Sequence, residues 1–338
     1  METVDVIAGR MPALKEIELC STEWTIDQRH FPTILSSNLL HFRTDLDVIL
    51  PPSLLGRDLR ELEITVTTPE CTPLTLLASH INLEVAVFHI SKEIHLPSSA
   101  VHGVRVHAPN LTDLELSLPD ARDWTVFRSI MTNLYAPRLE AIKLHISGSY
   151  ANETISDWQM GGDGTFGLAS ATRVIIEYGG GDVVSYANLL HALSLFDSVE
   201  HLELNGMRIQ SSLDERVLRR LEHEQMFPKL RTLLLRDAHF GGDKSQEERA
   251  KYFAHLATWR EHKLGTMVVG EARYESSFRD AIEDSIRCSS KCSLVWREGW
   301  RGRSPHRWQI GLGEDLQSCD RQLSSCPPTC FRHGHCPF

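Results

Sequence analysis

The sequence predicts an α/β solenoid, in which one short parallel strand per repeat is followed by a segment that returns the chain to the next strand. Three observations predict this fold. An apolar pattern recurs along the chain, apolar residues between its copies have helical spacing, and prolines stand just before several copies. One such repeat cannot bury its apolar residues alone, so neighbouring repeats must stack. We expect the strands on the concave side of the array and the helices on its convex side.

The recurring pattern, L-x-x-L-x-L, has apolar residues at its first, fourth and sixth positions. Eight copies begin at Leu14, Leu59, Leu83, Leu111, Leu139, Ala171, Val199 and Leu230, and a weaker copy begins at Leu39. From Leu59 onward, the first positions are 24, 28, 28, 32, 28 and 31 residues apart. A single match would fit any half-buried strand or helix, but eight in near-regular order indicate a stacked array.

The segments between the copies carry apolar residues at the spacing of one helix face. Helices are predicted at 75–81, 121–135, 185–196, 214–227 and 245–259. In the second of these, Phe127, Ile130 and Met131 should face the core. The prolines that precede a copy end any helix before it, because proline lacks an N–H and fixes φ. They are Pro12, Pro109, Pro137 and Pro228.

The composition excludes several classes of partner. The chain has 338 residues and a formal charge of −10, with 45 acidic and 35 basic residues, which argues against nucleic-acid or anionic-membrane binding. No run of 18 apolar residues is present, and the N-terminus lacks a basic region followed by an apolar stretch. Six of the eight cysteines lie between Cys288 and Cys336, so no disulfide framework spreads through the body. These features predict a cytoplasmic or nuclear protein.

The sequence divides into three parts. We expect the solenoid at 1–275, a terminal helix and strand as a capping region at 276–298, and a disordered, Cys-rich tail at 299–338. The tail holds five arginines and three acidic residues, whereas the rest of the chain is strongly acidic. Its Cys and His residues could hold Zn²⁺, but their spacing lacks the paired C-x2-C of zinc sites, so no metal site is predicted.

One glycine-rich motif offers an enzymatic alternative. GGDGT, at 161–165, resembles the phosphate-contacting motif of diacylglycerol and NAD kinases, in which it follows a buried strand and precedes a helix. Here a polar segment precedes it and the strand-like RVIIEY, at 173–178, follows. A nucleotide-dependent kinase is therefore a remote alternative, and the sequence predicts neither catalytic residues nor a cofactor.

PRLEAIKL and PKLRTLLL, with helices between the copies, resemble the irregular leucine-rich repeats of fungal F-box proteins over residues 11–270. The resemblance implies a non-catalytic domain that holds a target for a cullin-type ubiquitin ligase. Two departures stand out. The consensus Asn or Cys after the sixth position is missing, and the F-box that binds a Skp-type adaptor is not visible. Adaptor binding is expected only if an F-box lies upstream, and the alternative is a stand-alone repeat scaffold.

The binding surface should be formed by strand residues that flank the buried positions, among them also Arg173 and Glu177. The residues expected to bind a protein are Glu18, Glu61, Glu63, His89, Asp113, Glu115, Lys143, His145 and Glu203. Their acidic N-terminal half predicts a partner with basic segments, because opposite charge speeds association and selects partners. On that hypothesis, reversing Glu61, Glu63 and Glu115 to lysine weakens capture. The alternative is a face that is polar only because it is solvated.

Overall fold

The structure is a computed structural model of the 338-residue chain. The described residues are 15–19, 39–47, 57–66, 72–91, 105–118, 124–146, 170–178, 198–206, 208–209, 227–236, 239–240, 266–270, 280, 283 and 293–297. The predicted helices at 185–196 and 245–259, the GGDGT motif and the Cys-rich tail all lie outside these ranges.

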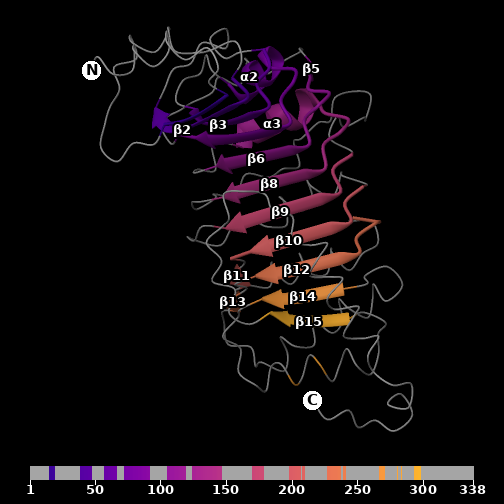
Figure 1. Ribbon diagram of the computed structural model, residues 1–338. Coiled ribbons are helices and arrows are strands. Elements are labelled where there is room, and N and C mark those ends of the chain that lie inside the picture. The colour runs from indigo at the N-terminus through magenta and orange to yellow at the C-terminus, as the bar shows by residue number, and fades with distance from the viewer. Residues whose placement is uncertain are drawn as a thin grey trace. The chain divides into compact units, whose positions relative to one another are not determined.

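Eleven of the described strands form one large parallel sheet, in which their order across the sheet follows their order along the chain (Figure 1). Its eleven strands, in their order across the sheet, are β1 (Glu16–Leu19), β2 (His41–Asp47), β3 (Glu61–Val66), β4 (Val85–Ile90), β6 (Asp113–Leu118), β8 (Ala141–Ile146), β9 (Arg173–Tyr178), β10 (His201–Asn205), β12 (Thr232–Arg236), β14 (Thr266–Gly270) and β15 (Ser293–Arg297). Two smaller parallel pairs join β5 (Val106–His107) to β7 (Leu134–Tyr135), and β11 (Arg208–Ile209) to β13 (His239–Phe240).

The strand register confirms the predicted repeat. Leu62 lies opposite Ala86, and Ala86 lies opposite Leu114, so equivalent positions of successive copies are aligned. The weaker copy at Leu39 is a full member of the sheet, because β2 pairs with both β1 and β3. β14 is a further copy that was not predicted from the sequence, although Met267 and Val269 fit the pattern.

The core is made by the apolar positions that define the repeat. Side chains of a strand alternate between its two faces, so every second residue points into the array. β3 shows this as strict alternation of buried and more exposed residues. The first positions are almost completely buried, with 0% or 1% of their surface exposed at Leu39, Leu59, Leu83, Leu111, Leu139, Ala171, Val199 and Leu230. Neighbouring strands of a sheet lie about 4.8 Å apart, so the apolar residues of successive copies are close enough to pack together.

Among the described residues, helices occur at α2 (Pro73–Ser79) and α3 (Trp124–Asn133). The Thr72 side chain caps α2 by accepting a hydrogen bond from the Thr75 N–H at 3.2 Å. In α3, Phe127, Ile130 and Met131 are buried, as their spacing predicted. The α/β arrangement is therefore confirmed for these two segments.

The prediction of a helix through residue 227 was wrong at its last residue. Phe227 has φ of 50°, outside the helical region, and its side chain is fully buried. Pro228 follows it, and a residue before proline is disfavoured in the helical conformation. None of the helices in the described part of the chain is long and apolar enough to cross a membrane.

Polar side chains link successive repeats just before their strands begin. The Asn82 amide donates to the Arg57 carbonyl at 3.0 Å, and the Asn110 amide donates to the Ile81 carbonyl at 3.3 Å. Ser170 donates to the Ala136 carbonyl at 3.1 Å. These residues stand immediately before the first apolar position of their copies, so each of them links its own copy to the preceding one.

Replacing Asn110 by alanine should lower the free energy of unfolding by about 1 kcal/mol, because an uncharged hydrogen bond contributes about that much. Urea unfolding measures the change. Lys229→Ala is the matched control, since Lys229 is exposed at the equivalent position of another copy. Equal effects of the two variants would show that the Asn110 contact does not stabilise the array.

Candidate functional site

The candidate site is the face of the sheet that points away from the core, here called the outer face. The alternate residues of the strands form three rows across it. The first row contains Glu16, His41, Glu61, Asp113, Arg173 and His201; the second contains Glu18, Arg43, Glu63, Glu115, Lys143 and Glu203; the third contains His89, Ser117, His145, Glu177 and Asn205. All nine residues expected to bind a partner lie on this face, because strand alternation places them there.

At the β1–β3 end, arginine and histidine contact several carboxylates. Arg43 forms ion pairs with Glu18 at 3.3 Å and Glu63 at 3.0 Å, and His41 contacts Glu61 at 3.0 Å. The Glu18 and Glu61 side chains remain 53% and 56% exposed. With Glu16, four carboxylates and one arginine lie at this end of the face, which therefore keeps an excess of negative charge.

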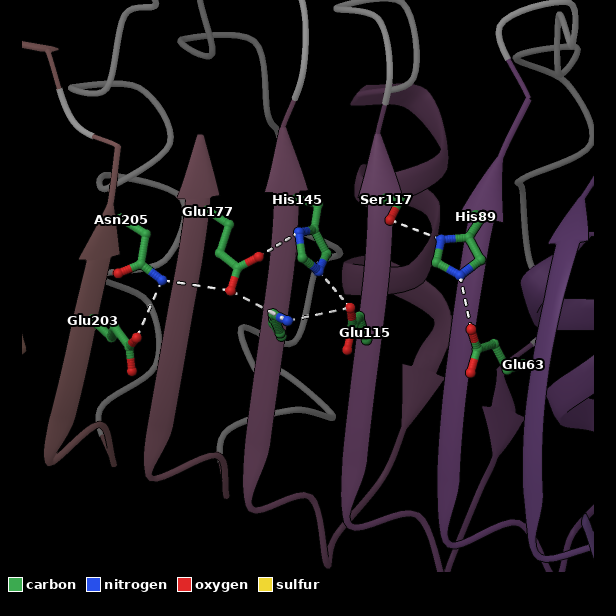
Figure 2. Close-up of polar contacts among 9 residues, drawn as sticks. Glu63, His89, Glu115, Ser117, His145, Glu177, Glu203 and Asn205 are labelled. Carbon is green, nitrogen blue, oxygen red and sulfur yellow. Dashed lines mark hydrogen bonds and ion pairs between the residues drawn. The ribbon is translucent and has the colours of Figure 1, made fainter. Parts of the chain in front are cut away.

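Ser117, His89 and Glu63 are connected in series across β6, β4 and β3. His89 Nδ1 lies 2.9 Å from the Ser117 hydroxyl, and His89 Nε2 lies 3.4 Å from Glu63 Oε1 (Figure 2). Hydrolases use this order of groups, but they also need preorganised donors for the oxyanion. The backbone N–H groups of a paired strand lie in the plane of the sheet and face neighbouring strands. We interpret the series as a link between three strands.

The centre of the outer face carries four charged residues from three adjacent strands. They are Glu115 on β6, Lys143 and His145 on β8, and Glu177 on β9, and they are called the charge cluster below. His145 Nε2 contacts Glu115 Oε1, and His145 Nδ1 lies 2.7 Å from Glu177 Oε2. Lys143 Nζ contacts the same two carboxylates, at 3.4 Å and 3.2 Å. Figure 2 shows the His145 ring between the carboxylates of Glu115 and Glu177.

The contacts of the charge cluster shift the ionisation of its members. Burial disfavours the charged form of His145, but hydrogen bonds with Glu115 and Glu177 outweigh burial and raise the pKa of His145 to about 9. Burial also works against ionised Glu177, yet His145 and Lys143 outweigh it and lower its pKa to about 2. The pKa of Glu115 is lowered for the same reason. At neutral pH the cluster therefore holds two cations and two anions.

The polar network continues from the charge cluster to β10. The Asn205 amide donates to Glu177 Oε1 at 3.5 Å and to Glu203 Oε1 at 3.1 Å. Glu203 is buried and lies 3.6 Å from the Arg173 guanidinium. Asp113 belongs to a different environment, where its carboxylate accepts a hydrogen bond from the Thr112 hydroxyl at 2.7 Å and burial raises its pKa.

Sequence reasoning missed Ser117 and Asn205. Each stands 28 residues after a residue that it contacts, Ser117 after His89 and Asn205 after Glu177. The repeat period could have found both, had the alternation been followed one position further along each strand. In the described part of the chain, no group of three or more His, Cys, Asp or Glu residues is arranged to hold a metal ion.

No protein-family model matches the chain, and no curated protein matches it. Among solved structures, the chain is similar to the leucine-rich repeat-containing protein LegL7 from Legionella pneumophila. The two share 11% sequence identity with a TM-score of 0.43, and the alignment covers 93% of this chain and 91% of LegL7. The assignment of the fold rests on the strand pairing described above.

Proposed function

We propose that the chain is a non-catalytic protein-binding repeat domain that uses its outer face to hold a partner. The observation that carries this proposal is the paired sheet of eleven strands, which fixes polar side chains in regular rows. An array that is pre-ordered before binding loses little conformational entropy when a partner docks. Extended repeat arrays use such surfaces for binding.

The outer face offers two electrostatically different regions to a partner. The carboxylates of the charge cluster are engaged by Lys143 and His145, whereas Glu16 and Glu61 at the β1–β3 end are exposed. A basic segment would gain most at the end with excess negative charge, because opposite charge steers association. The proposed docking region is therefore the first and second rows of β1–β3, and the proposed partner is a protein with a basic segment.

Reversing Glu16 and Glu61 together to lysine should slow association with such a partner and flatten its dependence on salt, because the attraction is screened by salt. The probe is a displayed library of random peptides, selected on the unchanged domain and then measured on the variants at low and high salt. The matched control is Glu84→Lys with Glu140→Lys, which changes the same charge at two exposed residues just before β4 and β8. Selection of peptides without basic residues, or equal binding by both double variants, would contradict the proposed partner.

The resemblance to fungal F-box proteins supports a further role, namely substrate recognition for a cullin-type ubiquitin ligase. Mapping the 5′ end of the transcript tests that role. An in-frame F-box upstream of Met1 would support it, and binding to a Skp-type adaptor would be measured next. Stop codons directly upstream would remove the ligase role and leave a stand-alone scaffold, with the docking region unaffected.

A further inference from the structure

The geometry around His145 requires a doubly protonated ring. Its two nitrogens face carboxylate oxygens on opposite sides, Glu115 on β6 and Glu177 on β9. A neutral imidazole has one N–H and one lone pair, so it can donate to only one of the two. The lone pair of the other nitrogen would then face a lone pair of a carboxylate oxygen, and the two would repel each other. Because the lowered pKa values of Glu115 and Glu177 keep both carboxylates ionised, the arrangement is favourable for the imidazolium, which donates to both.

Lys143, like His145, lies on β8 and contacts carboxylates of both neighbouring strands, β6 and β9. Its ammonium contacts Glu115 and Glu177, and the side chains of all four residues of the charge cluster are less than one third exposed. Charge pairs shielded from water are screened less than exposed ones. Removing one partner of such a group leaves an uncompensated charge that is costly to keep away from water. Each residue of the charge cluster therefore depends on its two partners of opposite charge.

We propose that the charge cluster is an ionic clamp that makes β6, β8 and β9 open as one cooperative unit, and that loss of the His145 proton releases it. The clamp is a property of the fold and does not depend on the proposed partner. Neighbouring repeats in solenoids are coupled through the interfaces that they share. Here the four charged residues of the cluster connect three strands across two such interfaces, that between β6 and β8 and that between β8 and β9.

Few other charges face the clamp from the strands packed beside it. They are Asp113 on β6, Arg173 on β9, and Glu203 on β10, which pairs with Arg173. The uncharged polar residues Ser117 and Asn205 lie in the same row as His145, and Asn205 donates to Glu177. Of the charged residues in the clamp, His145 is the one whose pKa is raised to about 9, so its proton sets the response to alkaline pH.

The sign of the effect follows from the direction of the shift. The pKa of His145 is raised from 6.5 to about 9 by folding. The stabilisation is therefore complete below about pH 6.5 and is lost as the pH rises through about 9.

Nuclear magnetic resonance titration of the intact protein, with the His145 signal assigned by its loss in His145→Gln, should give a midpoint near 9. Over the same pH range, the urea midpoint of the unchanged protein should fall, and that of His145→Gln should stay nearly constant, because glutamine does not titrate. His89→Gln is the matched control, since His89 lies on the same face but contacts a serine and one carboxylate. It should keep the alkaline fall.

Hydrogen exchange tests the cooperative part of the proposal. After correction for intrinsic exchange rates, amides of β6, β8 and β9 should lose protection together as the pH rises, and β3 amides should not follow. A His145 midpoint at or below 6.5, or parallel alkaline falls with and without His145, would overturn the proposal. Independent loss of protection in the three strands would overturn it too. If His145→Gln does not fold, the pH dependence of the urea midpoint and of hydrogen exchange in the unchanged protein still tests the proposal.

Discussion

Replacing Phe88 by alanine is expected to lower the free energy of unfolding by about 3–5 kcal/mol, which is typical of a buried phenylalanine. Phe88 is fully buried at the sixth position of its repeat, in register between Ile64 of β3 and Leu116 of β6. The strands on both sides are themselves fixed by further strands, so the structure can collapse into the cavity only in part.

Urea unfolding of Phe88→Ala measures this loss, and Ile81→Ala is the control. Ile81 is 56% exposed, so its truncation should change stability by no more than about 0.5 kcal/mol. Because each repeat contacts only its neighbours, a cavity in β4 should also separate the unfolding of β1–β3 from that of the later strands. If Phe88→Ala lowered the free energy of unfolding by less than about 1 kcal/mol and still unfolded in a single transition, the result would contradict the proposed stacking of the core.

The buried face of the sheet could be predicted because it follows from one physical rule. Strand side chains alternate, so Leu114 and Leu116 must share a face, and only stacking between repeats can bury that face. β14 was not predicted as a copy of the repeat for two reasons. Met267 and Val269 stand where other copies have leucines, and the copy lies further from the preceding copy than the period predicts. The non-helical conformation of Phe227 depends on a backbone angle that apolar spacing does not encode.

The outer face could be predicted as a set of residues but not as a set of contacts. Alternation places Glu115 and His145 on the same face, yet their contact runs diagonally across the sheet, since Glu115 lies opposite Lys143. Which charges meet depends on register and on side-chain length. The sequence therefore predicted an acidic surface, whereas the structure engages Glu115 with two cations and Glu63 with Arg43. Reversal of Glu115 would test the clamp rather than docking.

Acidification should remove about 3 kcal/mol of stability through Glu177 alone. The pKa of Glu177 is lowered from 4.5 to about 2 in the folded protein, and each unit of such a shift corresponds to about 1.4 kcal/mol. A depressed pKa gives stabilisation that is present above about pH 4.5 and is lost as the pH falls through about 2. Because the Glu177 side chain is only 29% exposed, water screens this effect little.

Urea unfolding of Glu177→Gln between neutral pH and about pH 2 measures this contribution. The variant should be less stable than the unchanged protein at neutral pH, and its acid fall should be shallower by the same amount. Glu84→Gln is the control, because the Glu84 carboxylate is half exposed in its pair with Arg60, and exposed pairs contribute little. Superimposable acid falls in Glu177→Gln and the unchanged protein would contradict the shift. Since His145 also loses one of its two carboxylates, Glu177→Gln should weaken the alkaline fall as well, whereas Glu84→Gln should leave both falls intact.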